Sequence, residues 1–175
     1  MPLRRGMVQV YTGDGKGKTT AALGLALRAA GHQLRVVILQ FLKGWPSYGE
    51  LRGVQLLPTV TLRQFGREGF VNPRRPQVVD FELAEKGLAA AREAMLSGQV
   101  DVLILDELNT ALDLGLLKLT DVLSLIDERP AQVELVLTGR GAPEPLCQRA
   151  DLVTEMRAVK HPYNSGIDGR EGIEY

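Results

Sequence analysis

The residues with the clearest chemical potential form a segment near the N-terminus, residues 12–20, with the sequence TGDGKGKTT. It lies between an apolar run at residues 7–11, which predicts a strand, and a helical pattern from about residue 18 to 30 that Gly31 ends. Glycines let backbone N–H groups converge on phosphate oxygens, and the N-terminus of the helix adds partial positive charge. The segment therefore predicts a phosphate-binding loop.

We expect the whole loop to bind the phosphates of a nucleotide, through Thr12, Gly13, Asp14, Gly15, Lys16, Gly17, Lys18, Thr19 and Thr20. The ammonium of Lys18 can reach the phosphates, and the hydroxyl of Thr19 can ligate Mg²⁺. Thr12 stands where the usual pattern has glycine, and the extra glycines at 13 and 15 are expected to compensate. The alternative is a strand–helix turn that contains Gly-Lys-Thr by chance.

A pair of acidic residues, Asp106 and Glu107, follows a second apolar run at residues 102–105. The carboxyl end of a parallel strand is where α/β proteins bind ligands, and a carboxylate there can hold Mg²⁺ directly or through water. The alternative is an acidic start to the next helix. Together with the loop, the pair predicts a Mg²⁺-nucleotide site, but it does not predict the reaction.

The elements that must position these residues alternate between apolar runs and helical patterns, which predicts an α/β fold with a mostly parallel sheet. Further strands are predicted at residues 36–40, 61–65, 133–138 and 152–156, and loops at 41–53 and 66–76. Two later helices are predicted, at residues 77–97 and around 119–126, the second with Thr120 as its N-cap and Pro130 as its stop. Apolar stripes predict that the first helix is buried on two sides, through Leu27 among others, and that Phe81 joins the buried face of the long helix.

Length and composition narrow the function classes. The chain has 175 residues, which favours one domain, and 21 basic against 21 acidic residues, which counts against a nucleic-acid partner. One cysteine, Cys147, and two histidines exclude an internal disulfide and the usual zinc sites. Without a signal peptide or a run of about 20 apolar residues, we expect a cytoplasmic protein that does not enter a membrane.

Several longer motifs occur in order along nearly the whole chain: residues 10–20, 40–44 (QFLKG), 105–109 (LDELN), 137–143, 150–156, 159–163 and 172–175. Together they resemble the P-loop type of ATP:corrinoid adenosyltransferase, also called cob(I)yrinic acid a,c-diamide adenosyltransferase. The resemblance implies a P-loop NTPase-like, recombinase-like three-layer fold. It also implies that residues 157–175, which lack periodicity, pack on or near the site. Asn72 departs from the family, which often has tryptophan there.

The resemblance implies transfer of the 5′-deoxyadenosyl group of ATP to the Co(I) of a corrinoid, with release of triphosphate. The corrinoid would be cobalamin or cob(I)yrinic acid a,c-diamide, in adenosylcobalamin biosynthesis or salvage. It further implies Mg²⁺, with Mn²⁺ as a substitute, a flavoprotein electron donor and a homodimer. Lys18 and Glu107 would be catalytic, and Thr19, Asp106 and Glu107 would hold the metal.

Other residues carry two interpretations each. Phe70 is expected either to form an apolar wall against the corrinoid or to anchor its loop in the core. Arg140 would contact phosphate or form a structural ion pair. Trp45 would cover a base or the corrin, or anchor its loop, and His161 is expected to make a structural hydrogen bond rather than to ligate cobalt.

Three other functions remain open from the residues alone. They are a recombinase-like or generic P-loop ATPase, a small-molecule kinase, and a carrier of nucleotide or corrinoid that catalyses nothing. A kinase would produce ADP rather than triphosphate, and a carrier would form no carbon–cobalt bond.

Overall fold

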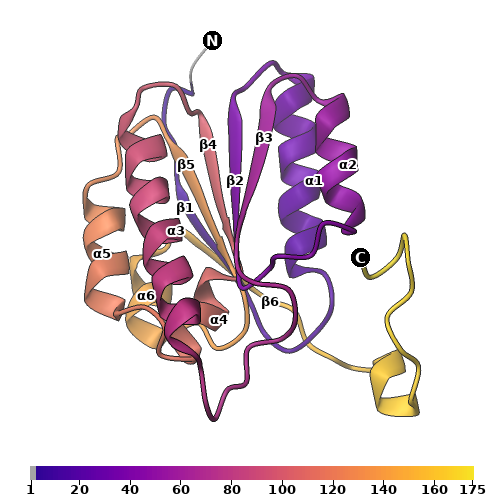
Figure 1. The fold of residues 1–175 in the computed structure, drawn as a ribbon. Helices are drawn as coiled ribbons and strands as arrows, with labels where there is room; N and C mark the ends of the chain where they lie inside the picture. The colour runs from indigo at the N-terminus through magenta and orange to yellow at the C-terminus, as the bar shows by residue number, and fades with distance from the viewer. Residues whose placement is uncertain (1–2) are drawn as a thin grey trace.

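Six strands form one sheet in the computed structural model, which describes residues 3–175 (Figure 1). The strands are β1 (Val8–Thr12), β2 (Val36–Phe41), β3 (Val60–Phe65), β4 (Val102–Asp106), β5 (Glu134–Thr138) and β6 (Leu152–Glu155). Their order across the sheet is β3-β2-β4-β5-β1-β6, and every neighbouring pair is parallel. The predicted α/β class with a parallel sheet is confirmed.

Helices cover both faces of this sheet. One face carries α1 (Lys18–Gly31) and α2 (Gly49–Gly53), and the other carries α3 (Val78–Leu96), α4 (Leu108–Asp113), α5 (Leu119–Asp127) and α6 (Glu144–Arg149) (Figure 1). Short 3₁₀ turns, η1 (Val54–Leu56) and η2 (Pro162–Ser165), complete the chain. Within residues 3–175, no helix combines the length and apolar character that crossing a bilayer requires.

The two faces of the sheet pack differently. Against α1 the sheet meets small side chains, Ala22, Ala26, Ala29 and Ala30. Against α3, α4 and α5 it meets larger ones such as Leu88, Leu108 and Leu125. Because alternate residues of a strand face opposite sides, each central strand contributes to both clusters.

Two burial predictions were wrong. Leu27 is 59% exposed, so α1 is buried only toward the sheet and not on two sides. Phe81 is 39% exposed, because it lies near the start of α3, while Ala84, Leu88 and Met95 further along the helix are buried. Periodicity identified the inner face of each helix but not where its contact with the sheet begins.

Helix ends also differ from the prediction. Gly31 is the last residue of α1, and the left-handed conformation after it falls on Gln33 (φ 60°). The N-cap of α5 is Lys118, while the Thr120 hydroxyl lies inside the helix and donates to Asp121. The short helices α2, α4 and α6 were not predicted, because so few residues carry too little periodicity to recognise.

Two helical glycines make a matched pair for testing the packing. A Cβ at Gly24 of α1 meets nothing within 4 Å, whereas one at Gly87 of α3 would lie 2.7 Å from the buried ring of Phe41. We expect Gly24→Ala to stabilise the protein by about 0.5–1 kcal/mol through helix propensity. We expect Gly87→Ala to destabilise it by about 1–3 kcal/mol through overpacking, and urea unfolding of both variants checks the opposite signs. Equal shifts would contradict the close contact of α3 with Phe41.

Candidate active site

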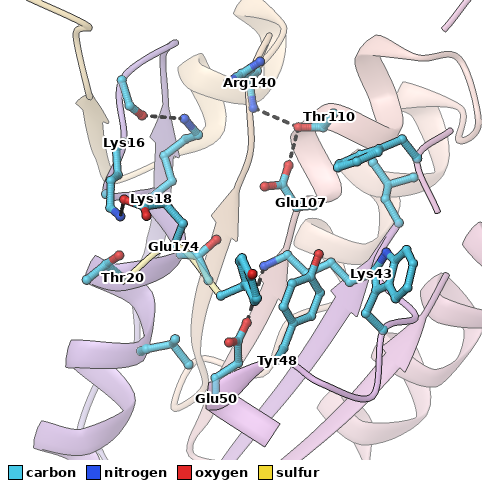
Figure 2. Close-up of a pocket in the computed structure, with 18 of the residues that line it drawn as sticks. Lys16, Lys18, Thr20, Lys43, Tyr48, Glu50, Glu107, Thr110, Arg140 and Glu174 are labelled. Atoms are coloured by element: carbon cyan, nitrogen blue, oxygen red, sulfur yellow. Dashed lines mark hydrogen bonds and ion pairs between the residues drawn. The ribbon is translucent and has the colours of Figure 1, made fainter. Parts of the chain in front are cut away.

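A cavity of about 950 Å³ opens at the carboxyl edge of the sheet (Figure 2). Segments far apart in the sequence line it: the loop after β1, the loop after β2, residues 69–71 with Pro73, the residues just after β4 and β5, and the last four residues of the chain. Its volume suits a nucleotide together with part of a larger ligand. The parallel sheet creates this convergence, because all six strands end at the same edge.

The glycines of residues 12–20 allow two chain segments to approach closely. Gly13 and Gly17 have positive φ values, 94° and 127°. A Cβ at Gly13 or Gly15 would come within 2.5–2.7 Å of the carbonyl oxygen of Met156, to which the Gly15 N–H donates at 2.6 Å. The loop is therefore braced by the chain that leaves β6, a requirement on the glycines that the sequence pattern did not reveal.

The two lysines of the loop point to different partners. The ammonium of Lys18 donates to the carbonyl oxygens of Gly13 (2.6 Å) and Gly15 (2.8 Å), and the residue is buried. Burial lowers the pKa of Lys18 below its ordinary value, while Glu107 acts in the opposite direction. Lys16 instead reaches the end of the chain, where it donates to the Ile173 carbonyl and the Glu174 carboxylate.

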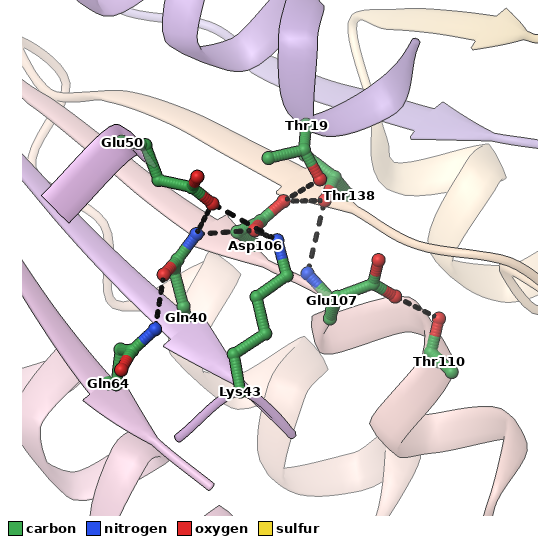
Figure 3. Close-up of polar contacts among 9 residues, drawn as sticks. All are labelled: Thr19, Gln40, Lys43, Glu50, Gln64, Asp106, Glu107, Thr110 and Thr138. Atoms are coloured by element: carbon green, nitrogen blue, oxygen red, sulfur yellow. Dashed lines mark hydrogen bonds and ion pairs between the residues drawn. The ribbon is translucent and has the colours of Figure 1, made fainter. Parts of the chain in front are cut away.

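The carboxylate of Asp106 accepts hydrogen bonds from four different side chains (Figure 3). Its Oδ1 accepts from the hydroxyls of Thr19 (2.8 Å) and Thr138 (2.7 Å). Its Oδ2 accepts from the Gln40 amide (3.1 Å) and the Lys43 ammonium (2.8 Å). Burial acts to lower the pKa of Lys43, but the charge and hydrogen bond of Asp106, together with the charges of Glu107 and Glu50, outweigh it and raise the pKa.

The donors at this point fit Mg²⁺. The Thr19 hydroxyl and the Asp106 carboxylate are adjacent hard oxygen ligands, the type that Mg²⁺ prefers. In the described part of the chain, residues 3–175, no three or more His, Cys, Asp or Glu side chains gather into a metal site. A bound Mg²⁺ would therefore take its other ligands from phosphate and water, as it commonly does beside nucleotides.

Glu107 follows Asp106 in the sequence, but its side chain lines the cavity and does not join the hydrogen bonds to Asp106. It has a left-handed backbone (φ 61°), its N–H donates to the Thr138 hydroxyl, and its carboxylate accepts from Thr110 at 2.6 Å. Thr110 also accepts the backbone N–H of Arg140 (3.0 Å). The Arg140 side chain lines the cavity and forms no ion pair with residues 3–175, so the structural ion-pair interpretation is wrong.

Apolar side chains from other segments also line the cavity. Phe70 is 90% exposed and Trp45 is 38% exposed, and both line the cavity together with Val71 and Leu114. The interpretation of Phe70 as an anchor in the core is therefore wrong. Asn72 accepts the backbone N–H of Arg74 in a turn and does not line the cavity.

The end of the chain reaches the mouth of the cavity. The ring of Tyr175 meets Tyr48 edge-on, with ring centroids 6.4 Å apart. Arg170 and Lys16 lower the pKa of Glu174 to about 2. Because this pKa lies below the ordinary value of 4.5, the stability that the Glu174 carboxylate contributes to the fold is fully present above pH 4.5. It is lost as the pH falls through about 2.

The remaining candidates lie as expected or outside the cavity. His161 lines the cavity and its Nδ1 accepts the Tyr163 N–H at 3.2 Å, a structural hydrogen bond as predicted. Cys147 is half-buried away from the cavity, and burial raises the pKa of its thiol.

Sequence reasoning assigned no role to several polar residues of the site: Gln40, Lys43, Glu50, Thr110 and Thr138. The signal was available for some of them. Polar residues at the end of an otherwise apolar strand, such as Gln40 and Thr138, mark the edge where ligands bind.

Comparison with known proteins identifies relatives along nearly the whole chain. The sequence profile of the family described as ATP:corrinoid adenosyltransferase BtuR/CobO/CobP matches residues 4–175. The chain is 39% identical to a corrinoid adenosyltransferase of Pseudomonas aeruginosa, over 98% of this chain and 84% of that protein. It is 36% identical to a corrinoid adenosyltransferase of Escherichia coli, over 98% of this chain and 86% of that protein.

Thr138 offers a test of the Asp106 network. Its hydroxyl donates to Asp106 and accepts from the Glu107 backbone, so Thr138→Val removes both contacts with little change in shape. We expect a loss of about 1–3 kcal/mol in the free energy of unfolding, because buried polar groups lose their partner. Thr138→Ser keeps the hydroxyl and should retain most of the stability. Denaturant unfolding decides, and equal effects of the two variants would show that the hydroxyl is unimportant.

Proposed function

Because the chain belongs to the ATP:corrinoid adenosyltransferase family, we propose that this cavity transfers the 5′-deoxyadenosyl group of ATP to the Co(I) of a corrinoid and releases triphosphate. The observation that carries the proposal is a single cavity that joins a phosphate-binding loop to an exposed apolar wall. A triphosphate fits the phosphate-binding loop, and the broad apolar face of a corrin ring can pack against Phe70 and Trp45.

The proposed reaction depends more on how the protein positions the two substrates than on acid–base catalysis. Co(I) is itself a strong nucleophile. It attacks the ribose 5′-carbon, a cobalt–carbon bond forms, and the carbon–oxygen bond to the triphosphate breaks with its electron pair. The cobalt must approach in line with that bond, so holding both substrates lowers the barrier. Positive groups near the triphosphate stabilise the charge that grows on it.

Residues of the loop supply that positive environment. We propose that N–H groups of residues 12–20, apart from that of Gly15, which donates to Met156, bind the triphosphate together with the ammonium of Lys18, and that Arg140 contributes from the end of β5. On nucleotide binding, Lys18 would exchange its contacts with the Gly13 and Gly15 carbonyls for phosphate oxygens. Since those contacts are within its own loop, the exchange needs no movement of an element.

The proposed metal is Mg²⁺, with Mn²⁺ as a substitute, held by Thr19 and Asp106 and reached by Glu107 from the cavity side. When bound, it would supply further positive charge to the leaving triphosphate. Thr138 and Thr110 orient the two carboxylates from behind. This support would let the two acidic residues act on the same metal although they face different ways.

The apolar wall is proposed to act on the corrinoid. Side chains such as Phe70 would exclude water and the lower axial ligand from cobalt, which favours Co(I). The electron would come from a flavoprotein donor. We also propose a homodimer and a cytoplasmic location, both of which rest on the family and on composition rather than on the cavity.

The decisive test is an anaerobic assay with reduced cob(I)alamin, ATP and Mg²⁺. We expect a light-sensitive adenosylated corrinoid in the visible spectrum and intact triphosphate by ion chromatography. Lys18→Ala should lower kcat by about 100-fold or more, because it removes a charge that acts on the leaving group. Arg92→Ala, which breaks a surface ion pair between α3 and Glu128 at the C-terminal end of α5, is the control.

The other candidate functions have their own signatures in this assay. ADP and phosphate without an adenosylated corrinoid would indicate an ATPase or kinase and would contradict the proposed reaction. Binding of both substrates without a carbon–cobalt bond would indicate a carrier.

We further propose that residues 157–175 close over the bound nucleotide. The contacts of Lys16 with Ile173 and Glu174, and of Tyr48 with Tyr175, support this. We expect ATP to slow trypsin cleavage at Arg157, Lys160 and Arg170 severalfold, because cleavage requires the segment to open. Mass spectrometry of timed digests measures this, with cleavage at Arg4 and Arg5 as an internal control. Unchanged rates at the three tail sites would contradict closure.

A further inference from the structure

A lysine that the proposed chemistry does not use lies at the centre of the polar network. The side chain of Lys43 is only 17% exposed, and its ammonium lies 2.8 Å from Asp106 Oδ2 and 3.7 Å from Glu50 Oε1. Figure 2 shows it entering the cavity beside Tyr48, whose ring centroid is 5.6 Å away. Burying a lysine is costly, so its presence calls for a reason beyond packing.

The backbone around Lys43 is constrained to place it there. Leu42 adopts a left-handed conformation (φ 61°), which is unfavourable for a residue with a branched side chain. A Cβ at Gly44 would lie 2.4 Å from the Gly66 carbonyl oxygen, and one at Gly66 would lie 2.3 Å from the Leu42 carbonyl carbon. The turn after β2 is therefore locked against the end of β3, and strain of this kind is typical of functional sites.

The two carboxylate oxygens of Asp106 have different partners, and Lys43 is one of those on Oδ2 (Figure 3). Oδ2 accepts from Lys43 and Gln40, while Oδ1 accepts from the hydroxyls of Thr19 and Thr138. The lysine thus provides the one charged contact among those that fix the rotation of the carboxylate. It also supplies positive charge among three carboxylates, Asp106, Glu50 and Glu107.

We propose that Lys43 is a positioning residue for adenosyl transfer, which holds Asp106 Oδ2 so that Oδ1 alone is directed toward Thr19 and the metal. It also limits the negative charge of the site. The role rests on the proposed function, because it concerns the same metal and the same transfer. Lys43 acts through Asp106 and does not itself contact the reacting atoms.

This role predicts opposite effects on metal binding and on turnover. Without the ammonium, the site gains net negative charge and Asp106 Oδ2 keeps only the amide of Gln40 as a donor, so a divalent cation should bind more tightly. The carboxylate is then held less firmly on its Oδ2 side, so the metal and the leaving triphosphate are positioned less well and kcat should fall. Removing a residue that only stabilised the fold would weaken both metal binding and turnover.

The chain contains a matched control for a purely structural ion pair. Arg35 and Asp101 join the same two strands, β2 and β4, at the opposite end of the sheet, 2.9 Å apart. Lys43 neutralises the buried Asp106 at the last residue of β4, and Arg35 neutralises the buried Asp101 just before the strand begins. Of the two cations, Lys43 lines the cavity and Arg35 does not.

The test compares Lys43→Met and Arg35→Met in the full chain. The Mn²⁺ dissociation constant of the nucleotide-free protein is measured from the free Mn²⁺ signal in electron paramagnetic resonance, and kcat from the anaerobic assay. For Lys43→Met we expect about tenfold tighter Mn²⁺ binding from the lost charge, and a kcat lower by about tenfold or more. For Arg35→Met we expect lower stability with both values unchanged.

Lys43→Arg keeps the charge and should restore Mn²⁺ affinity to within about twofold of the wild-type value. Lys43→Gln replaces the methionine variant if that variant does not fold. Unchanged or weaker Mn²⁺ binding on loss of the lysine would overturn the proposal. Since the Mn²⁺ titration needs neither ATP nor corrinoid, it tests the effect of Lys43 on the metal site even if adenosyl transfer is not observed. Tighter Mn²⁺ binding with an unchanged kcat would overturn the positioning role.

Discussion

The carboxylate of Asp106 is the interaction on which the site depends. Four side chains donate to it: Thr19 from α1, Gln40 from β2, Lys43 from the turn after β2, and Thr138 from β5. A buried carboxylate is strongly destabilising unless its oxygens are satisfied, so the network requires these elements to end at one place. The parallel sheet meets that requirement, because it brings the carboxyl ends of its strands to a common edge.

A second constraint is the close packing of the phosphate loop against the chain after β6. The backbones of Gly13 and Gly15 approach Met156 so closely that no side chain would fit between them. These glycines therefore serve two purposes, because the same lack of Cβ atoms that lets N–H groups reach phosphate also lets β6 lie beside β1. Beyond Met156 the chain continues to the mouth of the cavity, so the loop is held on one side by the sheet and on the other by the segment that lines the site.

The arrangement separates the tasks of the proposed reaction in space. Cationic and hydroxyl groups gather around the phosphate loop, while the exposed apolar Phe70 and Trp45 line the same cavity from other loops. Such a separation suits a reaction in which the leaving group is highly charged and the nucleophile is part of a large, flat ring. It also accounts for the absence of a general base from the proposed mechanism, since Co(I) needs no proton removed.

Much of this protein was determined by local sequence. The apolar runs predicted all six strands, and the phosphate loop and the Asp106-Glu107 pair were recognisable because their chemistry depends on neighbouring residues. The tertiary structure alone decided that Lys43 and Thr138 meet at Asp106, that Phe70 is exposed, and that Leu27 faces solvent. The physical reason is that hydrogen bonding and burial depend on which residues distant in sequence become neighbours. Strand order sets those neighbours, and no local pattern encodes it.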